Sequence, residues 1–565
     1  MSQSLPEVEP SLSAYRFYEE EWDGYEDLYD SFEWEIPETF NMARYTCDRW
    51  AEAAPDRVAL YAREGDGTAA EYTFGWLDER ASQLASCLAD EGISAGDRVA
   101  VNGSQKADCV VAMFAGWKLG AIVVPMSMLY GPEALEYRLA NSGATAYVVD
   151  EASVPTLRGI IDDLPDLETV LTVGDPEPLE EAVDLRAAME DRPTDFETEP
   201  TASSDTATIL YTSGTTGPPK GVKHAHDTLL GLLPSYVTSV CDNKIGHNVV
   251  RGPAELSWTG TLYNALLPSF YYGTSYVIDA HPQYDPEREL ETVDMFDITT
   301  LGGPATAFRM MMQIDDVEGR YDLSSTDVVL AGAESLGQSI VDWMKETMGD
   351  VAVHELYGQT EAPLVVADVE ALGVDHVTGA MGKALPGHEV DVLERDAPNP
   401  VPAGETGEIA VRYDDPICFE TFWNDDSKAR ERIDDGWLRT GDIGTKDENG
   451  YFRFEARKDD LIISSGYRIG PAEVEESLAT HAAVADAGVI GVPHETRGEV
   501  PKAFVVPADG HDTDEELREA LANYVKSELA KYKYPREIEF VAELPTTSTG
   551  KLQRRDLRQR EGLVD

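Results

Sequence analysis

Residues 209–221 read Ile-Leu-Tyr-Thr-Ser-Gly-Thr-Thr-Gly-Pro-Pro-Lys-Gly, and the fold is decided by this stretch. The apolar run 207–211 predicts a buried strand. Four hydroxyl side chains, three glycines and Lys220 follow between residues 212 and 221. Glycine lets the backbone approach a ligand closely, and free N–H groups, hydroxyls and an ammonium group together cradle phosphate oxygens. The stretch therefore predicts a strand followed by a phosphate-binding loop. It differs from the Walker pattern, because Lys220 precedes a glycine and no Ser or Thr follows it.

Helical and strand patterns alternate on both sides of this loop. Buried strands are predicted at 98–102, 121–126 and 146–150, and a helix at 107–119 separates the first two. The alternation resumes after the loop and continues to about residue 385. Such alternation is typical of parallel sheets with helices on both faces.

The remaining segments differ from this alternating part. Residues 151–206 are acidic and rich in proline, so we expect a surface excursion there. Short strand patterns separated by Gly and Asn turns predict a small β-rich subdomain at about 386–456. The predicted fold class is α/β: a large N-terminal domain of two βαβ-type sheets with this subdomain, followed by a small mobile α+β C-terminal domain. The predicted boundaries are 1–38 for an acidic and aromatic strap, 39–456 for the large domain, 457–460 for a hinge and 461–565 for the C-terminal domain.

The net charge is −61, because 106 acidic residues stand against 45 Lys and Arg. A nucleic-acid or anionic-membrane partner does not fit this charge. Self-repulsion of this size destabilises a compact state in dilute salt, whereas at molar salt the screening length falls to about 3 Å. We interpret the chain as an intracellular protein of a salt-accumulating organism, a halophile. Each phosphate of a bound ligand needs a positive group nearby, so the scarce Lys and Arg residues near motifs carry more information than usual.

The chain has five cysteines, an odd number, and they are scattered along the sequence. This fits neither a disulfide framework nor a metal cluster, and it is consistent with a reducing cytoplasm. The sequence contains no run of eighteen apolar residues, so no transmembrane helix is predicted. The acidic N-terminus does not have the pattern of a signal peptide. We therefore expect a cytoplasmic protein without a membrane span.

Four later motifs combine glycine with polar and charged residues. They are Tyr-Gly-Gln-Thr-Glu at 357–361, Gly-Trp-Leu-Arg-Thr-Gly-Asp at 436–442, Arg-Lys-Asp-Asp at 457–460 and Pro-Thr-Thr-Ser-Thr-Gly-Lys at 545–551. The first follows a predicted strand, at the edge where α/β sheets bind ligands. Glu361 is the kind of hard oxygen ligand that Mg²⁺ prefers. An acidic residue such as Asp442 can accept hydrogen bonds from two ribose hydroxyls.

Together with the loop at 209–221, these motifs resemble those of the acyl-adenylate-forming superfamily, the AMP-dependent synthetases and ligases. That superfamily includes acyl-CoA synthetases, peptide-synthetase adenylation domains and luciferases. The resemblance extends over roughly residues 40–560 with the motifs in order. Strings such as Gly-Lys-Ala-Leu-Pro-Gly at 382–387 resemble medium-chain acyl-CoA synthetases.

The resemblance implies a role for each motif residue. The loop that holds the ATP phosphates comprises Thr212, Ser213, Gly214, Thr215, Thr216, Gly217 and Lys220. The adenine and ribose site comprises Gly332, Ala333, Glu334, Tyr357, Gly358, Gln359, Asp442 and Arg457. The acyl pocket comprises Trp258, Thr259, Gly260, Gly332 and Gly358. The catalytic residues are Lys551, Thr360 and Glu361, and the Mg²⁺ ligands are Glu361 and Thr216.

The resemblance further implies a moving C-terminal domain. Asp459 is the expected hinge residue, and Gly466, Tyr467 and Arg468 are expected to face the tunnel for the CoA thiol. Lys551 is expected to bridge the substrate carboxylate and the α-phosphate as negative charge develops between them. A basic residue usually precedes the Ser-Gly or Thr-Gly step of this motif, whereas Thr547 and Ser548 stand there in this chain.

The implied activity is that of an AMP-forming acyl-CoA synthetase, an acid–thiol ligase that uses ATP, Mg²⁺ and coenzyme A. Acetate-specific relatives carry Trp at the position of Gly358, so Gly predicts room for a short- to medium-chain acid, including branched ones. One methylene is worth only about 1–3 kcal/mol of discrimination, which leaves the chain length open. The alternatives are an acetate or propionate ligase, an adenylating ligase with another acceptor and a silent nucleotide-binding paralogue. A homo-oligomer is a further possibility that the sequence leaves open.

Overall fold

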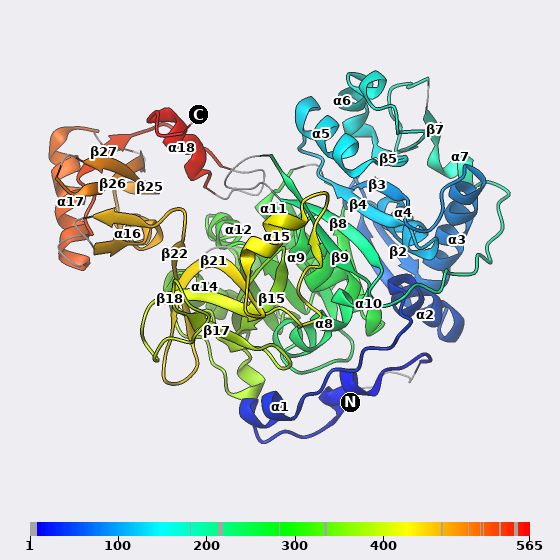
Figure 1. Cartoon of the computed structure of the whole chain (residues 1–565), viewed down its shortest axis with the longest axis horizontal. Coiled ribbons are helices and arrows are strands. Elements are labelled where there is room, and N and C mark those ends of the chain that lie inside the picture. The colour runs from blue at the N-terminus through cyan, green and yellow to red at the C-terminus, as the bar shows by residue number, and fades with distance from the viewer. Residues whose placement is uncertain are drawn as a thin grey trace. The chain divides into compact units, whose positions relative to one another are not determined.

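The computed structural model describes residues 8–180, 182–212, 218–281, 283–332, 336–464, 467–494, 496–508, 510–511, 513–529, 533–546 and 552–564. The chain divides into two compact units (Figure 1). Unit 1 comprises residues 1–390 and 411–438, and unit 2 comprises residues 391–410 and 439–565. The hinge expected at 457–460 falls inside unit 2, and the domain boundaries inferred from the motifs stay a prediction.

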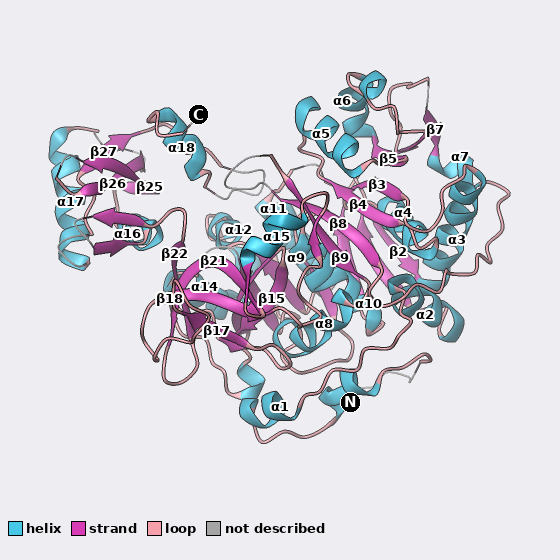
Figure 2. Ribbon diagram, in the orientation of Figure 1, coloured by secondary structure: helices cyan, strands magenta, loops and turns pink. Residues whose placement is uncertain are grey.

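Unit 1 contains two large, mostly parallel sheets with helices between and around them (Figure 2). The nine-stranded sheet has the order β16-β15-β14-β13-β12-β10-β11-β1-β2, and the eight-stranded sheet has the order β19-β9-β8-β4-β3-β5-β6-β7. The strands of the first are β1 (Val58–Arg63), β2 (Ala69–Thr73), β10 (Val249–Arg251), β11 (Ser275–Asp279), β12 (Thr300–Gly303), β13 (Val328–Gly332), β14 (Ala352–Gln359), β15 (Ala362–Ala367) and β16 (Lys383–Ala384). Those of the second are β3 (Arg98–Asn102), β4 (Ile122–Met126), β5 (Ala146–Asp150), β6 (Thr169–Val173), β7 (Ala182–Asp184), β8 (Thr206–Thr212), β9 (Lys220–Ala225) and β19 (Thr421–Phe422).

The helices of unit 1 cover these sheets. They are α1 (Tyr25–Ser31), α2 (Arg49–Ala53), α3 (Phe74–Asp90), α4 (Ala107–Lys118), α5 (Pro132–Ser142), α6 (Val154–Arg158), α7 (Leu185–Met189), α8 (Thr228–Ser235), α9 (Thr259–Thr261), α10 (Leu267–Tyr271), α11 (Pro286–Met295), α12 (Ala305–Met311), α13 (Val317–Arg320), α14 (Gln338–Met348) and α15 (Asp426–Arg432). Every residue of α4 and of α8 is buried. Helices α11, α12 and α14 share an apolar core with the nine-stranded sheet, and α5 and α6 share one with the eight-stranded sheet. A helix that is apolar on all sides belongs inside a protein, as α8 does here.

Unit 2 contains smaller sheets. Strands β17 (Val390–Leu393), β18 (Gly407–Arg412), β21 (Trp437–Lys446) and β22 (Phe452–Arg457) neighbour one another in that order and lie mostly within this unit. Strand β20 (Ile433–Asp434) and its partners Trp437 and Leu438 at the start of β21 belong to unit 1. A second sheet contains β23 (Ile462–Ser464), β24 (Tyr467–Ile469), β25 (Val484–His494), β26 (Gly498–Pro507) and β27 (Glu537–Phe540). Its core is closed by α16 (Pro471–Ala479) and α17 (Glu515–Glu528), and α18 (Arg554–Arg560) follows near the C-terminus. The α/β fold class predicted from the sequence is confirmed.

One expectation is wrong. Residues 151–206 were expected to form a surface excursion, but β6 lies within them, and all five of its residues are buried. The strand runs parallel to β5 and extends the eight-stranded sheet, while Val154 and Leu157 of α6 pack into its core. The acidic and proline residues that suggested a surface segment flank these short apolar runs.

The N-terminal segment, dark blue in Figure 1, is held on unit 1 by tyrosine hydroxyls. Tyr25 donates to the carbonyl of Ala384 at 2.7 Å, and Tyr29 donates to the carbonyl of His388 at 2.9 Å. Among the described residues, no helix combines the length and apolar character needed to cross a bilayer. All five cysteines are buried free thiols.

Candidate active site

The predicted phosphate loop connects two antiparallel strands of unit 1. Thr212 ends β8, Lys220 begins β9, and the two residues lie opposite each other in the register. The Lys220 ammonium lies 5.1 Å from the centre of the Phe422 ring on the neighbouring β19. A Cβ at Gly221 would meet Ile209 Cγ2 at 2.7 Å, so glycine is needed there for the close packing of the hairpin. A strand therefore leads into the loop, as the sequence predicts.

The Tyr357–Glu361 motif lies at the carboxyl end of β14. Tyr357, Gly358 and Gln359 end the strand, and Thr360 and Glu361 form the turn to β15. Gly332 ends the parallel neighbour β13 and lies opposite Leu356. Ligands of open α/β sheets bind outside the carboxyl ends of the strands. Gly332 and the Tyr357–Glu361 motif thus lie at the same edge of the nine-stranded sheet.

The expected acid pocket and the expected α-phosphate site meet in unit 1. Thr259, at the start of α9, donates from Oγ1 to Oγ1 of Thr360 at 3.4 Å. Trp258 is 40% exposed, and a Cβ at Gly260 would meet nothing within 4 Å. A carboxylate held beside Thr259 would therefore have open space around it and a hydroxyl nearby.

Glu361 lies against an arginine that no motif predicts. Arg432, the last residue of α15, forms an ion pair with the Glu361 carboxylate and donates from Nη2 to Gln359 Oε1 at 2.7 Å. The side chain of Glu361 is 12% exposed. A nearly buried carboxylate needs a positive charge beside it, and Arg432 supplies that charge here. A bound Mg²⁺ would meet the same need, so Glu361 fits the role of a Mg²⁺ ligand. The scarcity of basic residues is the one sequence signal that could have drawn attention to Arg432.

Gly358 packs closely against the backbone of β15. A Cβ there would lie 2.1 Å from the carbonyl oxygen of Pro363 and 2.8 Å from that of Ala362. Glycine is therefore required by the close approach of two strands, with a register shift between Tyr357 and Gln359. The role of Gly358 in opening the acid pocket stays a prediction.

The expected ribose-binding residues lie side by side in unit 2. Asp442 on β21 and Arg457 on β22 occupy paired positions, and Arg457 Nη1 donates to Asp442 Oδ1 at 2.8 Å. The side chain of Asp442 is 5% exposed and that of Arg457 is 35% exposed. A carboxylate whose position is fixed by an arginine is well placed to accept hydrogen bonds from vicinal hydroxyls.

The expected hinge is bound by the C-terminal helix. Arg558 of α18 donates to the carbonyl of Asp459 at 3.0 Å and lies 2.7 Å from Asp460 Oδ1. Arg554, one turn earlier, lies 3.6 Å from the other oxygen of Asp460. The sequence motifs did not predict these arginines, because Arg558 and its partner Asp459 lie 99 residues apart in the sequence.

Several predicted residues lie outside the described part of the chain. They are Ser213, Gly214, Thr215, Thr216, Gly217, Ala333, Glu334, Gly466 and Lys551. The backbone of Tyr467 and Arg468 forms β24, which pairs with β23. Leu552 directly follows Lys551 and forms a bridge with Thr546. The roles of all predicted site residues stay predictions.

Two histidines beside the phosphate loop are fully buried in β9 and the turn after it. Burial lowers the pKa of His224 to about 4, against a small opposing effect of the Thr360 backbone, and lowers that of His226 to about 3. His226 Nδ1 accepts a hydrogen bond from Met42 N at 3.1 Å, which fits a neutral ring. Burial therefore favours the neutral form of both rings.

Comparisons with known proteins relate the chain to one family of enzymes. Family models described as AMP-binding enzyme and AMP-binding enzyme C-terminal domain match residues 47–417 and 473–551. The human mitochondrial acyl-coenzyme A synthetase ACSM4 is 33% identical over 540 residues, which cover 93% of this chain and 91% of that protein. The acetyl-coenzyme A synthetase of Bacillus subtilis (strain 168) is 31% identical over 552 residues, 94% of each chain. The crystal structure of the anthranilate CoA ligase AuaEII with anthranoyl-AMP superposes with a TM-score of 0.84 at 30% identity, covering 94% of this chain and 98% of that one.

Proposed function

Since the chain belongs to the AMP-binding enzyme family, as an AMP-forming acyl-CoA ligase, we propose that it activates short- to medium-chain carboxylic acids, including branched ones. Enzymes of this kind use ATP and coenzyme A. The observation that carries the choice of site is the 3.4 Å contact between Thr259 and Thr360. It joins the segment expected to hold the acid to the segment expected to hold the α-phosphate.

In the first half-reaction, a carboxylate oxygen of the acid attacks the α-phosphorus of ATP. The bond to the β-phosphate breaks, so acyl-adenylate and pyrophosphate form. Positioning and neutralisation of charge account for most of the catalysis in phosphoryl transfer. We assign the Thr360 hydroxyl and the Lys551 ammonium to the α-phosphate, and Thr212 and Lys220 to the outer phosphates. Mg²⁺, when held by Glu361 and Thr216, adds positive charge beside the phosphate oxygens.

In the second half-reaction, the CoA thiolate attacks the acyl carbonyl and AMP leaves. Asp442 and Arg457 retain the ribose, and Asp459 absorbs the backbone rotation between two poses of the C-terminal domain. No cysteine nucleophile is required, and the buried thiols of this chain fit that, since burial raises the pKa of Cys109 to about 12.

The direct test is acid-dependent AMP release in about molar KCl, with MgATP and CoA. The acids are the straight chains from acetate to decanoate, 2-methylbutyrate and benzoate. A maximum beyond propionate is the expected result. Lys551→Ala is expected to abolish AMP formation while leaving release of AMP from added acyl-adenylate and CoA. Absence of acid-dependent AMP with every acid would refute the proposal.

A second candidate substrate is acetate or propionate, favoured by the 31% identity to the acetyl-coenzyme A synthetase. The same assay separates the two, because the maximum then lies at acetate. Adenylate that accumulates without discharge by CoA would instead indicate a different acceptor.

A further inference from the structure

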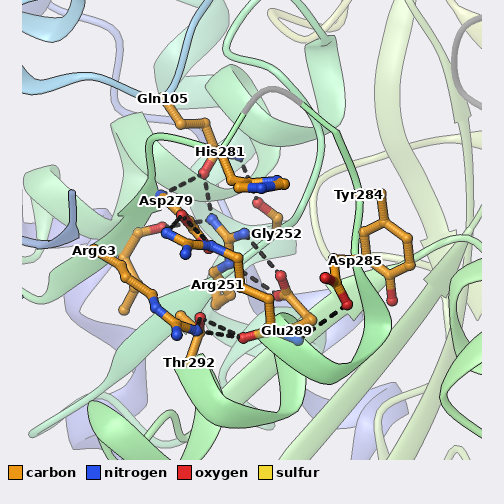
Figure 3. A network of polar contacts seen from close by, with 12 residues as sticks. Arg63, Gln105, Arg251, Gly252, Asp279, His281, Tyr284, Asp285, Glu289 and Thr292 are labelled. Atoms are coloured by element: carbon orange, nitrogen blue, oxygen red, sulfur yellow. Dashed lines mark hydrogen bonds and ion pairs between the residues drawn. The ribbon is translucent and has the colours of Figure 1, made fainter. Parts of the chain in front are cut away.

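A buried polar network links the ends of β10 and β11 with helix α11 and with the loop that follows β3 (Figure 3). Arg251 ends β10 and is 3% exposed. Its Nε and Nη2 donate to Glu289 Oε1 and Oε2 of α11 at 2.9 and 2.8 Å. A third nitrogen, Nη1, donates to Val277 O at 3.2 Å and to Gln105 Oε1. A buried, bidentate ion pair with these additional acceptors holds the guanidinium in one orientation.

Gln105 comes from the other sheet, in the loop that follows β3. Gln105 is 7% exposed, and both its amide oxygen and its amide nitrogen have hydrogen-bond partners. Oε1 accepts from Arg251 and from the backbone N–H of Asp279 at 3.0 Å. Nε2 donates to the carbonyl oxygens of Gly252 (3.0 Å) and Ala254. Because Arg251 and an N–H both require an acceptor, the oxygen of the amide must face them, and the NH₂ group must face the two carbonyls.

The two carbonyls belong to the segment 252–257, which leads directly into Trp258. Contacts from the loops after β3 and β4 also fix the later residues of this segment. Leu256 N donates to Gly103 O at 2.7 Å, and Met128 N donates to Glu255 Oε2 at 3.2 Å. A Cβ at Gly103 would lie 2.4 Å from Ser257 N, so the two backbones are as close as glycine allows. The path of the chain into Trp258–Gly260 is therefore set by groups of the eight-stranded sheet.

We propose that Gln105 is a positioning residue for the acid pocket, which fixes segment 252–257 and thereby sets the preference for acyl-chain length. The inference rests on the function proposed above. Gln105 touches no reacting group and acts through the backbone that precedes Trp258. Pocket walls discriminate methylenes by small free-energy differences, so a shift of this backbone changes chain-length preference before it changes nucleotide binding.

Two variants separate this role from general support of the network. Gln105→Leu removes every hydrogen bond of the amide but leaves the Arg251–Glu289 pair in place. Gln105→Glu keeps acceptors for Arg251 and for Asp279 N, yet has no donor for the carbonyls of Gly252 and Ala254. Gln83→Leu and Gln83→Glu on α3 are the matched controls, because Gln83 makes one 3.4 Å contact to Arg192 O and one 3.1 Å contact from Arg80.

The measurement is the dissociation constant of hydrolysis-resistant N-acyl-sulfamoyl adenosines with two to eight acyl carbons, and of AMP, by calorimetry in molar KCl. Both Gln105 variants are expected to change the ratio of constants between the eight- and two-carbon mimics by about tenfold. AMP binding is expected to change less than about twofold. Amide hydrogen exchange across 252–258 is expected to accelerate, while exchange in β11 stays unchanged.

An unchanged chain-length ratio in both variants overturns the inference. Equal weakening of AMP and all mimics also overturns it, because that result indicates a purely structural role. If the wild-type protein binds no mimic more tightly than AMP, the proposed function fails together with the inference, and the wild type alone reveals that outcome.

Discussion

Arg457 donates from Nη1 to Oδ1 of Asp442 across paired positions of β22 and β21, at 2.8 Å. The pair places a carboxylate and a cation together at the point where the ribose of the adenylate is expected. A carboxylate fixed in this way loses less freedom on binding a diol, and hydrogen bonds to charged groups contribute about 1.5–3 kcal/mol each.

Asp442→Ala is therefore expected to weaken AMP binding by at least about tenfold, the equivalent of one such bond. Pyrophosphate, which lacks a ribose, is expected to bind as before. Arg453→Met, on the same strand as Arg457, serves as control. Calorimetry with both ligands measures the effect, and AMP affinity equal to the wild type in Asp442→Ala would remove Asp442 from the ribose site.

The Glu361–Arg432 ion pair predicts opposite effects of its two members on the Mg²⁺ requirement. Glu361→Gln removes the charged ligand, so the Mg²⁺ concentration for half-maximal ATP–pyrophosphate exchange is expected to rise by about 10- to 100-fold, as when groups around a metal site are lost. Arg432→Met removes a competing cation, so this concentration is expected to fall. Arg430→Met, an exposed arginine of the same helix, is the control. A shift in the same direction in both variants would contradict the assignment.

Two glycines of the expected acid pocket predict different outcomes on substitution by alanine. At Gly358 a Cβ would collide with Pro363 O, whereas at Gly260 it would meet nothing within 4 Å. Gly358→Ala is expected to destabilise by about 1–3 kcal/mol and to lower activity with every acid alike. Gly260→Ala is expected to keep the melting temperature and to lower kcat/KM selectively for the longest acids, by up to about tenfold.

Differential scanning fluorimetry and the acid series measure both glycine variants. A selective loss of long-chain acids in Gly358→Ala, with unchanged stability, would show that the residue lines the pocket after all. Uniform activity of Gly260→Ala across all chain lengths would place the pocket elsewhere.

Local sequence patterns predicted the strands that position the site, because the apolar run of each strand is contiguous in the sequence. The apolar run 207–211 forms most of β8, and the strand before Tyr357 ends at the predicted sheet edge. Strand β6 was missed, because its short apolar run lies between acidic and proline residues that suggested a surface segment, whereas the structure buries all five of its residues. Arg432 and Gln105 could not be predicted either, because their partners lie 71 and 146 residues away along the chain.

The net charge of −61 predicts a strong dependence of stability on salt. Mutual repulsion of the acidic residues falls as the screening length shortens from about 10 Å at 0.1 M to about 3 Å at 1 M. The melting temperature is expected to rise steeply between 0.1 and 2 M KCl, and choline chloride at equal ionic strength is expected to reproduce most of the rise. Sucrose at equal osmolality is the control without charge. Equal stabilisation by sucrose would indicate a general effect of solute exclusion.

Acidification predicts a loss of stability through the two buried histidines of the β9 region. Burial lowers the pKa of His224 to about 4 and that of His226 to about 3, whereas an unfolded histidine titrates near 6.5. Below pH 6.5 the unfolded chain therefore binds protons that the folded chain does not. Stability is complete above that pH and falls as the pH drops toward 4, by about 1.4 kcal/mol per pH unit for each histidine. Asp227 opposes this trend, since burial and the charge of Glu420 raise its pKa to about 6.

The melting temperatures at pH 7.5 and 5.0 in molar KCl separate these contributions. His226→Gln keeps an acceptor for Met42 N and removes the titrating ring, so its drop on acidification is expected to be smaller than in the wild type. Asp227→Asn removes the opposing group, so its drop is expected to be larger. The exposed His494→Gln is expected to behave as the wild type. An identical drop in His226→Gln and the wild type would mean that the pKa of His226 is the same in the folded and unfolded chain, and the assignment of a ring held neutral by burial would be wrong.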